Sequence, residues 1–230
     1  MDFQEGEILY FDKAQGWTSF NLVAKVRRML CLKLGIKKLK VGHAGTLDPL
    51  ATGVLIVCTG KSTKRIAELQ GQEKEYVATL QLGATTPSFD LEKPVDKTYP
   101  TQHITEELVR ETLRRFEGEI DQVPPAFSAC KVDGHRAYRL AKRGEEVELK
   151  PKRISIKGIE LLEFNPQEMR LSIRVTCSKG TYIRALARDI GTALRSGAYL
   201  TALRRTRIGS TRVEECLRIE DFEEYMATNI

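Results

Sequence analysis

The residues of this sequence that could do chemistry are concentrated in one glycine-rich stretch, Gly42 to Leu55, which contains a single carboxylate, Asp48. Asp48 is the only acidic residue between Asp12 and Glu68, although lysines and arginines are frequent in that interval. A lone carboxylate among so many cations indicates either a special role in the fold or a role in chemistry.

Asp48 is followed by Pro49, and a residue before proline is restricted to extended backbone conformations. The glycines at positions 45 and 53 would let another chain approach closely. The surrounding positive charge favours the ionised carboxylate, which can act as a nucleophile or a base. The alternative is a purely structural turn, because Asp-Pro dipeptides usually mark turns.

The sequence does not contain the residue patterns that several other catalytic mechanisms require. The stretch holds no second carboxylate for the paired-acid mechanism of glycosidases. The three histidines, at positions 43, 103 and 135, do not have the spacing of metal ligands, and no Ser-His-Asp or Cys-His arrangement stands out. Residues 59–62 resemble the end of a phosphate-binding P-loop, but Leu55 stands where that motif requires glycine. The residues alone therefore indicate metal-free chemistry centred on Asp48.

The charge distribution favours an anionic partner. The chain of 230 residues has a net charge of +6 and a pI near 9.0. Residues 27–40 include six basic residues and no acidic one, and residues 203–207 form another basic cluster. The segment 27–40 is either an ordinary solvated face or a surface that contacts phosphates, and the cluster 203–207 is expected to follow a phosphate backbone. From Val213 onward acidic residues dominate, and we expect a terminal helix there that faces away from the polyanion.

The composition is that of a globular protein outside the secretory pathway. The five cysteines are scattered, so neither a disulfide framework nor a zinc site is expected. The acidic N-terminus is unlike a signal peptide, and no apolar run approaches the ~18 residues of a membrane span. We therefore expect a cytoplasmic location.

Hydrophobic patterns predict the elements that would position Asp48. A strand over Gly6–Phe11 precedes a helix over about Phe20–Leu30 that Thr18 or Ser19 could cap. The apolar run 54–58 predicts a buried strand directly after the loop. Ser62 could cap a short helix that ends at Gly71.

The strand predicted over residues 76–82 begins with Tyr76 and places it on the same face as Ala78, Leu80 and Leu82. A tyrosine there is usually part of the core or its rim, and the sharper alternative is a platform on which a base stacks.

In the second half of the chain, the residue pattern predicts two helices and two further strands. One helix runs from the cap Thr105 to about Phe116, with Gly118 as its C-cap, and the other follows a cap at Thr181. Strands over 154–164 and 169–177 pair around an Asn-Pro turn. Between these parts, residues 124–152 form a basic flap, with a helix expected over 137–143. The fold class is therefore α/β of the α+β type.

The stretch Gly42–Leu55 resembles the signature of the TruB family of tRNA pseudouridine synthases. Further blocks match the family in order along nearly the whole chain. These blocks are Asp12–Ser19, Lys74–Tyr76, Gln122–Ala129 with the basic flap, Ser178–Arg184 and Leu203–Thr206. The resemblance implies a pseudouridine synthase fold, with a central, largely antiparallel mixed sheet flanked by helices and a catalytic cleft across it.

The resemblance implies an activity without cofactor or metal: conversion of uridine-55 in the T-loop of tRNA to pseudouridine. Asp48 would attack the ribose C1′ or remove a ribose proton while the N-glycosidic bond breaks. The detached uracil then rotates and rejoins through C5. Because the target base is stacked inside the folded tRNA, it must be flipped out first.

The resemblance also implies roles for seven further residues. Tyr76 would stack on the target base and receive the C5 proton, Arg184 would pair with Asp48 and keep it ionised, and His43 would lie against the RNA where the base flips. Tyr182, Lys64 and Asp90 would line the site, and Lys13 would make an RNA contact or a structural contact.

We expect one catalytic domain over residues 1–230, acting as a monomer on the T-arm stem-loop of tRNA. Many bacterial relatives continue into a C-terminal RNA-binding PUA domain that this sequence does not contain, so T-arm hairpins should remain substrates although binding is weaker. Two alternatives stay open. One is an RNA-binding protein or RNA chaperone without catalysis, which has no use for a carboxylate such as Asp48. The other is a synthase that works within a ribonucleoprotein.

Overall fold

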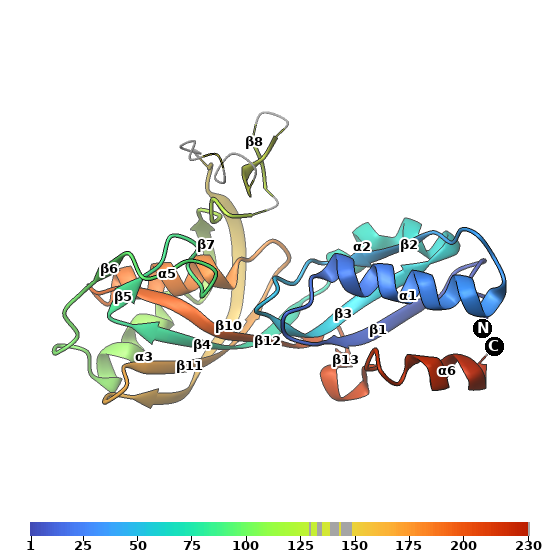
Figure 1. Cartoon of the computed structure of the whole chain (residues 1–230). Coiled ribbons are helices and arrows are strands. Elements are labelled where there is room, and N and C mark those ends of the chain that lie inside the picture. The colour runs from blue at the N-terminus through green and yellow to red at the C-terminus, as the bar shows by residue number, and fades with distance from the viewer. Residues whose placement is uncertain (129, 133–134, 139–142, 144–148, 230) are drawn as a thin grey trace. The chain divides into compact units, whose positions relative to one another are not determined.

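The computed structural model of the chain describes residues 1–128, 130–132, 135–138, 143 and 149–229. The chain divides into two compact units, both labelled by element in Figure 1. Unit 1 comprises Met1–Tyr76 and Leu203–Ile230, and unit 2 comprises Val77–Ala202.

Unit 1 contains a small sheet with helices. Its elements are β1 (Ile8–Lys13), α1 (Ser19–Leu34), β2 (Val41–Ala44), β3 (Thr52–Thr59), the 3-10 helix η1 (Gly60–Arg65), α2 (Ile66–Gln70), β13 (Thr211–Arg212), the 3-10 helix η2 (Val213–Glu215) and α6 (Phe222–Asn229). β1 and β2 both pair antiparallel with β3, whereas β12 (Ala198–Ile208) pairs with β3 in parallel at Arg204 and Arg205.

β3 is the central strand of unit 1, and both of its faces are buried. Leu55 and Val57 belong to the core cluster that includes α1 and α6, while Val54, Ile56 and Cys58 belong to a second cluster with α2. A strand buried on both faces has an uninterrupted apolar sequence. This explains the apolar run 54–58 and confirms the strand predicted there.

α1 forms as predicted and is longer than its apolar pattern indicated. Thr18 is the N-cap, and its hydroxyl accepts a hydrogen bond of 3.0 Å from the backbone N–H of Asn21. Gly35, in the left-handed conformation with φ of 63°, ends the helix. Leu22, Val26 and Leu30 are buried against the strands, and Figure 1 shows α1 lying along β1 and β3.

Unit 2 is also mostly sheet. Its elements are β4 (Lys74–Leu82), β5 (Ala84–Thr85), β6 (Lys97–Thr98), α3 (Glu106–Arg114), β7 (Gly118–Gln122), β8 (Lys131–Val132), β9 (His135–Arg136), β10 (Lys152–Asn165), β11 (Arg170–Cys177), α5 (Ile183–Ala193) and the first part of β12. β4 and β12 each have one end in each unit.

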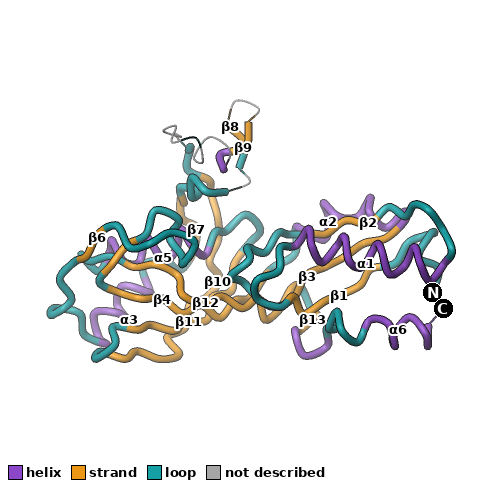
Figure 2. The backbone as a smooth tube through the Cα atoms, viewed as in Figure 1, coloured by secondary structure: helices purple, strands orange, loops and turns teal. Residues whose placement is uncertain are grey.

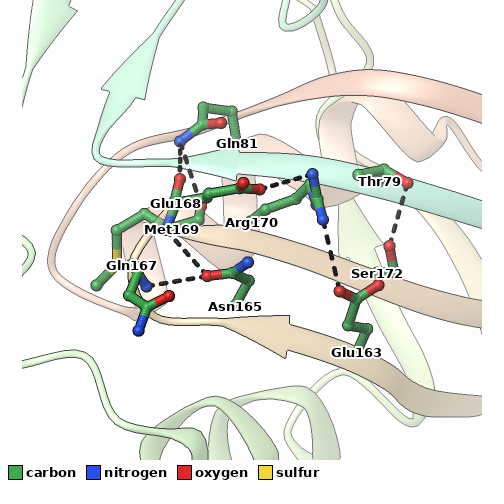
Figure 3. Close-up of polar contacts among 9 residues, drawn as sticks. All are labelled: Thr79, Gln81, Glu163, Asn165, Gln167, Glu168, Met169, Arg170 and Ser172. Carbon is green, nitrogen blue, oxygen red and sulfur yellow. Dashed lines mark hydrogen bonds and ion pairs between the residues drawn. The ribbon is translucent and has the colours of Figure 1, made fainter.

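The hairpin of β10 and β11, visible as two long orange segments in Figure 2, confirms the two strands predicted around the Asn-Pro turn. β11 buries every second residue, from Leu171 to Cys177, as its alternating sequence predicts. In the turn, the side chain of Asn165 accepts hydrogen bonds from the backbone N–H groups of Gln167 and Glu168, each 3.0 Å long (Figure 3). Arg170 pairs across the same turn with Glu168 and Glu163.

The main sheet has the hydrogen-bonded order β1-β3-β12-β4-β11-β10-β7, with β2 beside β3 and β13 beside β12. All pairings with a described register are antiparallel except that of β12 with β3. The predicted fold class, α+β with a largely antiparallel mixed sheet and flanking helices, is therefore confirmed. No helix in the described part of the chain is long and apolar enough to span a membrane.

Three predicted helix boundaries are wrong. Ser62 lies inside η1, and α2 starts only at Ile66, although it ends before Gly71 as predicted. Thr181 donates its hydroxyl to the carbonyl of Ser178, so Tyr182 is the N-cap of α5. Gly118 does not cap α3, which ends at Arg114 with Arg115 as its C-cap; Gly118 begins β7 instead. In each case another element, a 3-10 helix, a turn or a strand, uses the residue that the pattern assigned to a helix end.

The predicted flap 124–152 includes residues 129, 133–134, 139–142 and 144–148, which lie outside the described residues. Most of the helix predicted over 137–143 lies outside them as well. Among the described residues of this segment, β8 and β9 form a short antiparallel pair.

We expect the double-sided burial of β3 to dominate the stability of unit 1. Leu55→Ala removes a side chain that is 0% exposed and should lower the free energy of unfolding by about 3 kcal/mol. Leu32→Ala on α1, where the side chain is 73% exposed, should change it by no more than about 0.5 kcal/mol. Urea unfolding of the two variants measures both values, and similar losses would contradict the assignment of β3 as the core strand.

Candidate active site

The backbone of the loop that carries Asp48 is held in place by hydrogen bonds from the segment 16–19 and by one bond within the loop. Ser19, the first residue of α1, donates its hydroxyl to the carbonyl of Leu47 and accepts from the N–H of Leu47, at 3.1 and 2.9 Å. The N–H of Gly16 donates to the carbonyl of Pro49 at 2.8 Å, and that of Ala51 to the carbonyl of Asp48 at 3.0 Å. These bonds fix the backbone on both sides of the half-buried Asp48.

Arg205 joins the same group from β12, and the sequence interpretation missed it. Its side chain is 1% exposed, so the prediction that the cluster at residues 203–207 contacts phosphates is wrong for Arg205. Its Nε donates to the carbonyl of Val54 at 2.7 Å and its Nη2 to the carbonyl of Gly45 at 3.0 Å. Its Nη1 lies 3.5 Å from the hydroxyl of Tyr76, with the guanidinium carbon 5.9 Å from the ring centroid.

A signal for the burial of Arg205 was present in the sequence. Leu203 and Arg205 are one strand period apart and both are buried, as strand alternation requires. The neighbouring arginines concealed this pattern. They also make contacts inside the fold, because Arg204 forms an ion pair with Asp12 at 2.8 Å and Arg207 forms one with Glu73 at 3.0 Å.

Tyr76 lies on the buried face of β4 and is 7% exposed. The predicted face of Tyr76, Ala78, Leu80 and Leu82 is confirmed, since all four side chains are buried. The contact between its hydroxyl and Arg205 places Tyr76 in the same unit and the same contact group as the Asp48 loop.

His43 lies on β2, where it pairs in register with Val57. Burial lowers the pKa of the half-buried imidazole, and the positive charge of Arg205 lowers it further. Its Nδ1 is buried without a hydrogen-bond partner among the described residues. His43 is therefore a neutral ring near pH 7, which suits contact with a base better than contact with a phosphate.

Lys13 is the last residue of β1, and its side chain is fully buried. Its ammonium donates to the carbonyls of Ala14 and Trp17 at 2.9 and 2.6 Å. Burial lowers the pKa of Lys13 to about 8, with the charge of Asp48 acting in the opposite direction. Lys13 thus makes structural contacts within unit 1, and its contact with RNA stays a prediction. Lys64, by contrast, is exposed on η1.

Unit 2 holds the other predicted residues. Arg184 on α5 is 6% exposed and lies 3.8 Å, from Nε to Oδ2, from Asp90, which is 4% exposed. Arg184 also donates to the carbonyls of Ser88 and Phe127, at 3.2 and 2.8 Å. Its predicted pairing with Asp48 stays a prediction, because Asp48 belongs to the other unit.

Tyr182, at the start of α5, is oriented by a buried glutamine of β7. The N–H of Tyr182 donates to Oε1 of Gln122 at 2.9 Å, and Nε2 of Gln122 donates to the carbonyl of Tyr182 at 3.1 Å. Burial is the main cause that raises the pKa of the Tyr182 hydroxyl. The phenol therefore stays protonated over the physiological range.

Taken separately, the two units offer different chemistry. Unit 1 brings the Asp48 loop together with Arg205, Tyr76, His43 and Lys13, so it supplies a carboxylate in a fixed backbone beside cations and a phenol. Unit 2 supplies a buried guanidinium held by a carboxylate. No group of three or more His, Cys, Asp or Glu side chains that could hold a metal ion occurs among the residues for which a placement is described.

Comparison with known proteins gives the class of the chain. Residues 27–183 match the family model described as TruB family pseudouridylate synthase (N terminal domain), and residues 184–229 match the model described as tRNA pseudouridylate synthase B C-terminal domain. A solved structure, the Cbf5-Nop10-Gar1 complex, superposes on 97% of this chain and 55% of that chain, with a TM-score of 0.73 and 31% identity. The fold and the family models define a pseudouridylate synthase.

Curated relatives give the family. A protein of Phocaeicola vulgatus named tRNA pseudouridine synthase B is 68% identical over 98% of this chain and 95% of its own length. A protein of Bacteroides fragilis with the same name is 66% identical over 98% of this chain and 96% of its own length. The chain belongs to the TruB family.

The close approach of β3 and β12 at Gly53 and Arg205 can be tested by substitution. Gly53 has φ of 104°, and a Cβ there would lie 2.1 Å from the carbonyl oxygen of Arg205. Gly53→Ala should therefore lower the free energy of unfolding by about 3 kcal/mol or more, through strain and displacement of β12. Gly16→Ala is the control, because Gly16 also has positive φ, 82°, but open space around its Cβ.

For Gly16→Ala we expect a loss of only about 1 kcal/mol, from the backbone conformation alone. Urea unfolding measures both variants. Equal losses would mean that the contact between Gly53 and Arg205 is unimportant.

The lowered pKa of His43 predicts how stability changes with pH. Between the folded pKa and the ordinary value of 6.5, the unfolded chain binds a proton that the folded protein does not. This contribution to stability is therefore complete above pH 6.5 and is lost as the pH falls through that window. His43→Gln should make the decline in the free energy of unfolding from pH 7.5 to 5.5 shallower. A titration of His43 by NMR with a midpoint at or above 6.5 would contradict the prediction.

Proposed function

We propose that the chain converts uridine-55 in the T-loop of tRNA to pseudouridine. In this reaction the bond between N1 of uracil and C1′ of ribose breaks, and a bond between C5 and C1′ forms. C5 loses its proton and N1 gains one, so substrate and product are isomers. The observation that carries the proposal is the match to the TruB family along nearly the whole chain, including the stretch that holds Asp48.

Asp48 is proposed as the nucleophile that attacks C1′, or as the base that removes a ribose proton. A loop carboxylate is suited to this role when its backbone cannot move, since reaction rates fall steeply with misplacement of reacting atoms. The bonds from Ser19 and Gly16 to the loop support that requirement.

Tyr76 is proposed to stack on the uracil and to take part in removal of the C5 proton. Arg184 is proposed to pair with Asp48 and to keep it ionised. Support for the role of Arg184 is its buried position between Asp90 and two backbone carbonyls, which fixes the direction of its guanidinium. His43, Lys64, Asp90 and Tyr182 are proposed to contact the flipped nucleotide or its neighbours.

The substrate assignment is supported by two relatives that are named tRNA pseudouridine synthase B. The chain matches each of them over nearly its full length. It is also supported by the exposed cations of α1 and the segment that follows it. These are Lys25, Arg28, Lys33, Lys37, Lys38 and Lys40. Such a surface can contact the phosphate backbone without reading sequence. Action as a monomer, in the cytoplasm, and on isolated T-arm hairpins belongs to the same proposal.

The test is release of tritium from tRNA that carries ³H at C5 of its uridines. Asp48→Asn should reduce the rate at least about a thousandfold, because the amide is not a nucleophile or base at neutral pH. Asp221→Asn, an exposed residue of the same unit just before α6, is the matched control and should retain wild-type activity.

Filter binding of the same tRNA separates the outcomes. A folded Asp48→Asn variant that binds tRNA but releases no tritium supports the proposal. Equal release from wild type and Asp48→Asn would refute the role of Asp48. Absence of release from the wild-type protein, with tRNA binding intact, would favour a non-catalytic RNA-binding protein.

A further inference from the structure

Arg205 is a buried cation whose hydrogen bonds go to the parts of unit 1 that carry the proposed catalytic side chains. Its side chain is almost fully buried, which is costly for a charge unless hydrogen bonds compensate. The bonds are to the carbonyl of Val54 at 2.7 Å, the carbonyl of Gly45 at 3.0 Å and the hydroxyl of Tyr76 at 3.5 Å.

The two carbonyls flank the Asp48 loop in the sequence. Gly45 opens the loop after β2, and Val54 follows it near the start of β3. One guanidinium therefore joins the entry of the loop to its exit, and its third contact reaches Tyr76 on β4. The backbone of Arg205 is equally constrained, because it pairs in register with Gly53, where a Cβ would not fit.

We propose that Arg205 is a positioning residue that sets the placement of Asp48 relative to Tyr76. This inference rests on the proposed function, in which both residues act on the nucleotide. Arg205 is not proposed to contact the nucleotide; it acts by holding the ends of the Asp48 loop and the Tyr76 hydroxyl in one arrangement.

The chemistry of the side chain supports this role over a purely structural one. A planar guanidinium donates in several fixed directions at once, whereas a lysine ammonium is a compact point charge. Apolar residues can often replace buried ionic groups without loss of stability, so stability alone is a weak explanation for a buried arginine. The need to hold three acceptors from separate segments explains the arginine directly.

The charge of Arg205 has a second, independent consequence. It helps to lower the pKa values of His43 and Lys13, although burial is the larger cause for both. This makes the state of His43 a reporter of the guanidinium that does not depend on catalysis.

The experiment compares Arg205→Met, Arg205→Lys and a matched control, Arg207→Met. Arg207 lies on the same strand and pairs with Glu73, so its replacement also removes one positive charge. For Arg205→Met we expect kcat for tritium release to fall about a hundredfold, with KM near the wild-type value. Arg205→Lys keeps the positive charge but loses the planar guanidinium with its several donors, so we expect its kcat to fall about tenfold. Arg207→Met should have the kcat of the wild type.

NMR titration of the histidines provides the second measurement. In Arg205→Met the pKa of His43 should rise towards 6.5, whereas in Arg205→Lys and Arg207→Met it should stay low. Backbone resonances of Gly45 and Val54 should shift in both Arg205 variants. Urea unfolding establishes that each variant is folded, and if Arg205→Met does not fold, the Lys variant alone decides through its kcat.

The outcomes are separable. A wild-type kcat in a folded Arg205 variant, or a rise in KM without a fall in kcat, overturns the positioning role. Failure of the proposed function would appear instead as full activity of Asp48→Asn. In that case an unchanged His43 pKa and unchanged Gly45 resonances in Arg205→Met would still refute the contacts on which the inference rests.

Discussion

The buried positive charge of Arg205 constrains the strands and the loop that surround it in unit 1. A guanidinium removed from water must have its hydrogen bonds made by the protein, and carbonyls are the acceptors that a sheet and its loops can offer. Arg205 obtains them from Gly45 and Val54, so β12 has to lie against β3 in one register, with glycine at position 53. The conformation of the Asp48 loop follows from the same bonds. The Asp48 loop and the sheet are therefore held in place by the same hydrogen bonds.

Helix α1 supports the loop from the other side. The hydroxyl of the capping residue Thr18 accepts a hydrogen bond from a backbone N–H of the helix. The hydroxyl of Ser19, the first residue of the helix, forms hydrogen bonds with the backbone of Leu47 in the loop. The buried face of α1 packs on Leu55 and Val57 of β3. Packing of the core and placement of Asp48 are thus coupled through two adjacent residues. In unit 2, α5 plays a comparable part by carrying Arg184 towards Asp90.

Local patterns predicted most of the elements correctly. Alternation identified β11 and the buried face of β4, and the apolar run identified β3. The errors concern residues with more than one possible partner. Thr181 was expected to cap α5 but donates to Ser178, and Gly118 was expected to end α3 but starts β7. A hydroxyl or a glycine can serve a turn, a cap or a strand, and which one it serves depends on neighbours that are distant in sequence.

What the sequence by itself determined is the fold class, the TruB family and the position of Asp48 in its loop. These depend on residue order, hydrophobic periodicity and a motif that is continuous in the chain. Only the tertiary structure decided that Arg205 is a buried group beside this loop, and that the ammonium of Lys13 is buried and bonded to two backbone carbonyls. Their environment is made by segments far apart in the sequence: position 205 meets positions 45, 54 and 76 through pairing of β12 with β3. The charge of a residue does not show whether it is buried, because burial depends on which distant segments pack around it.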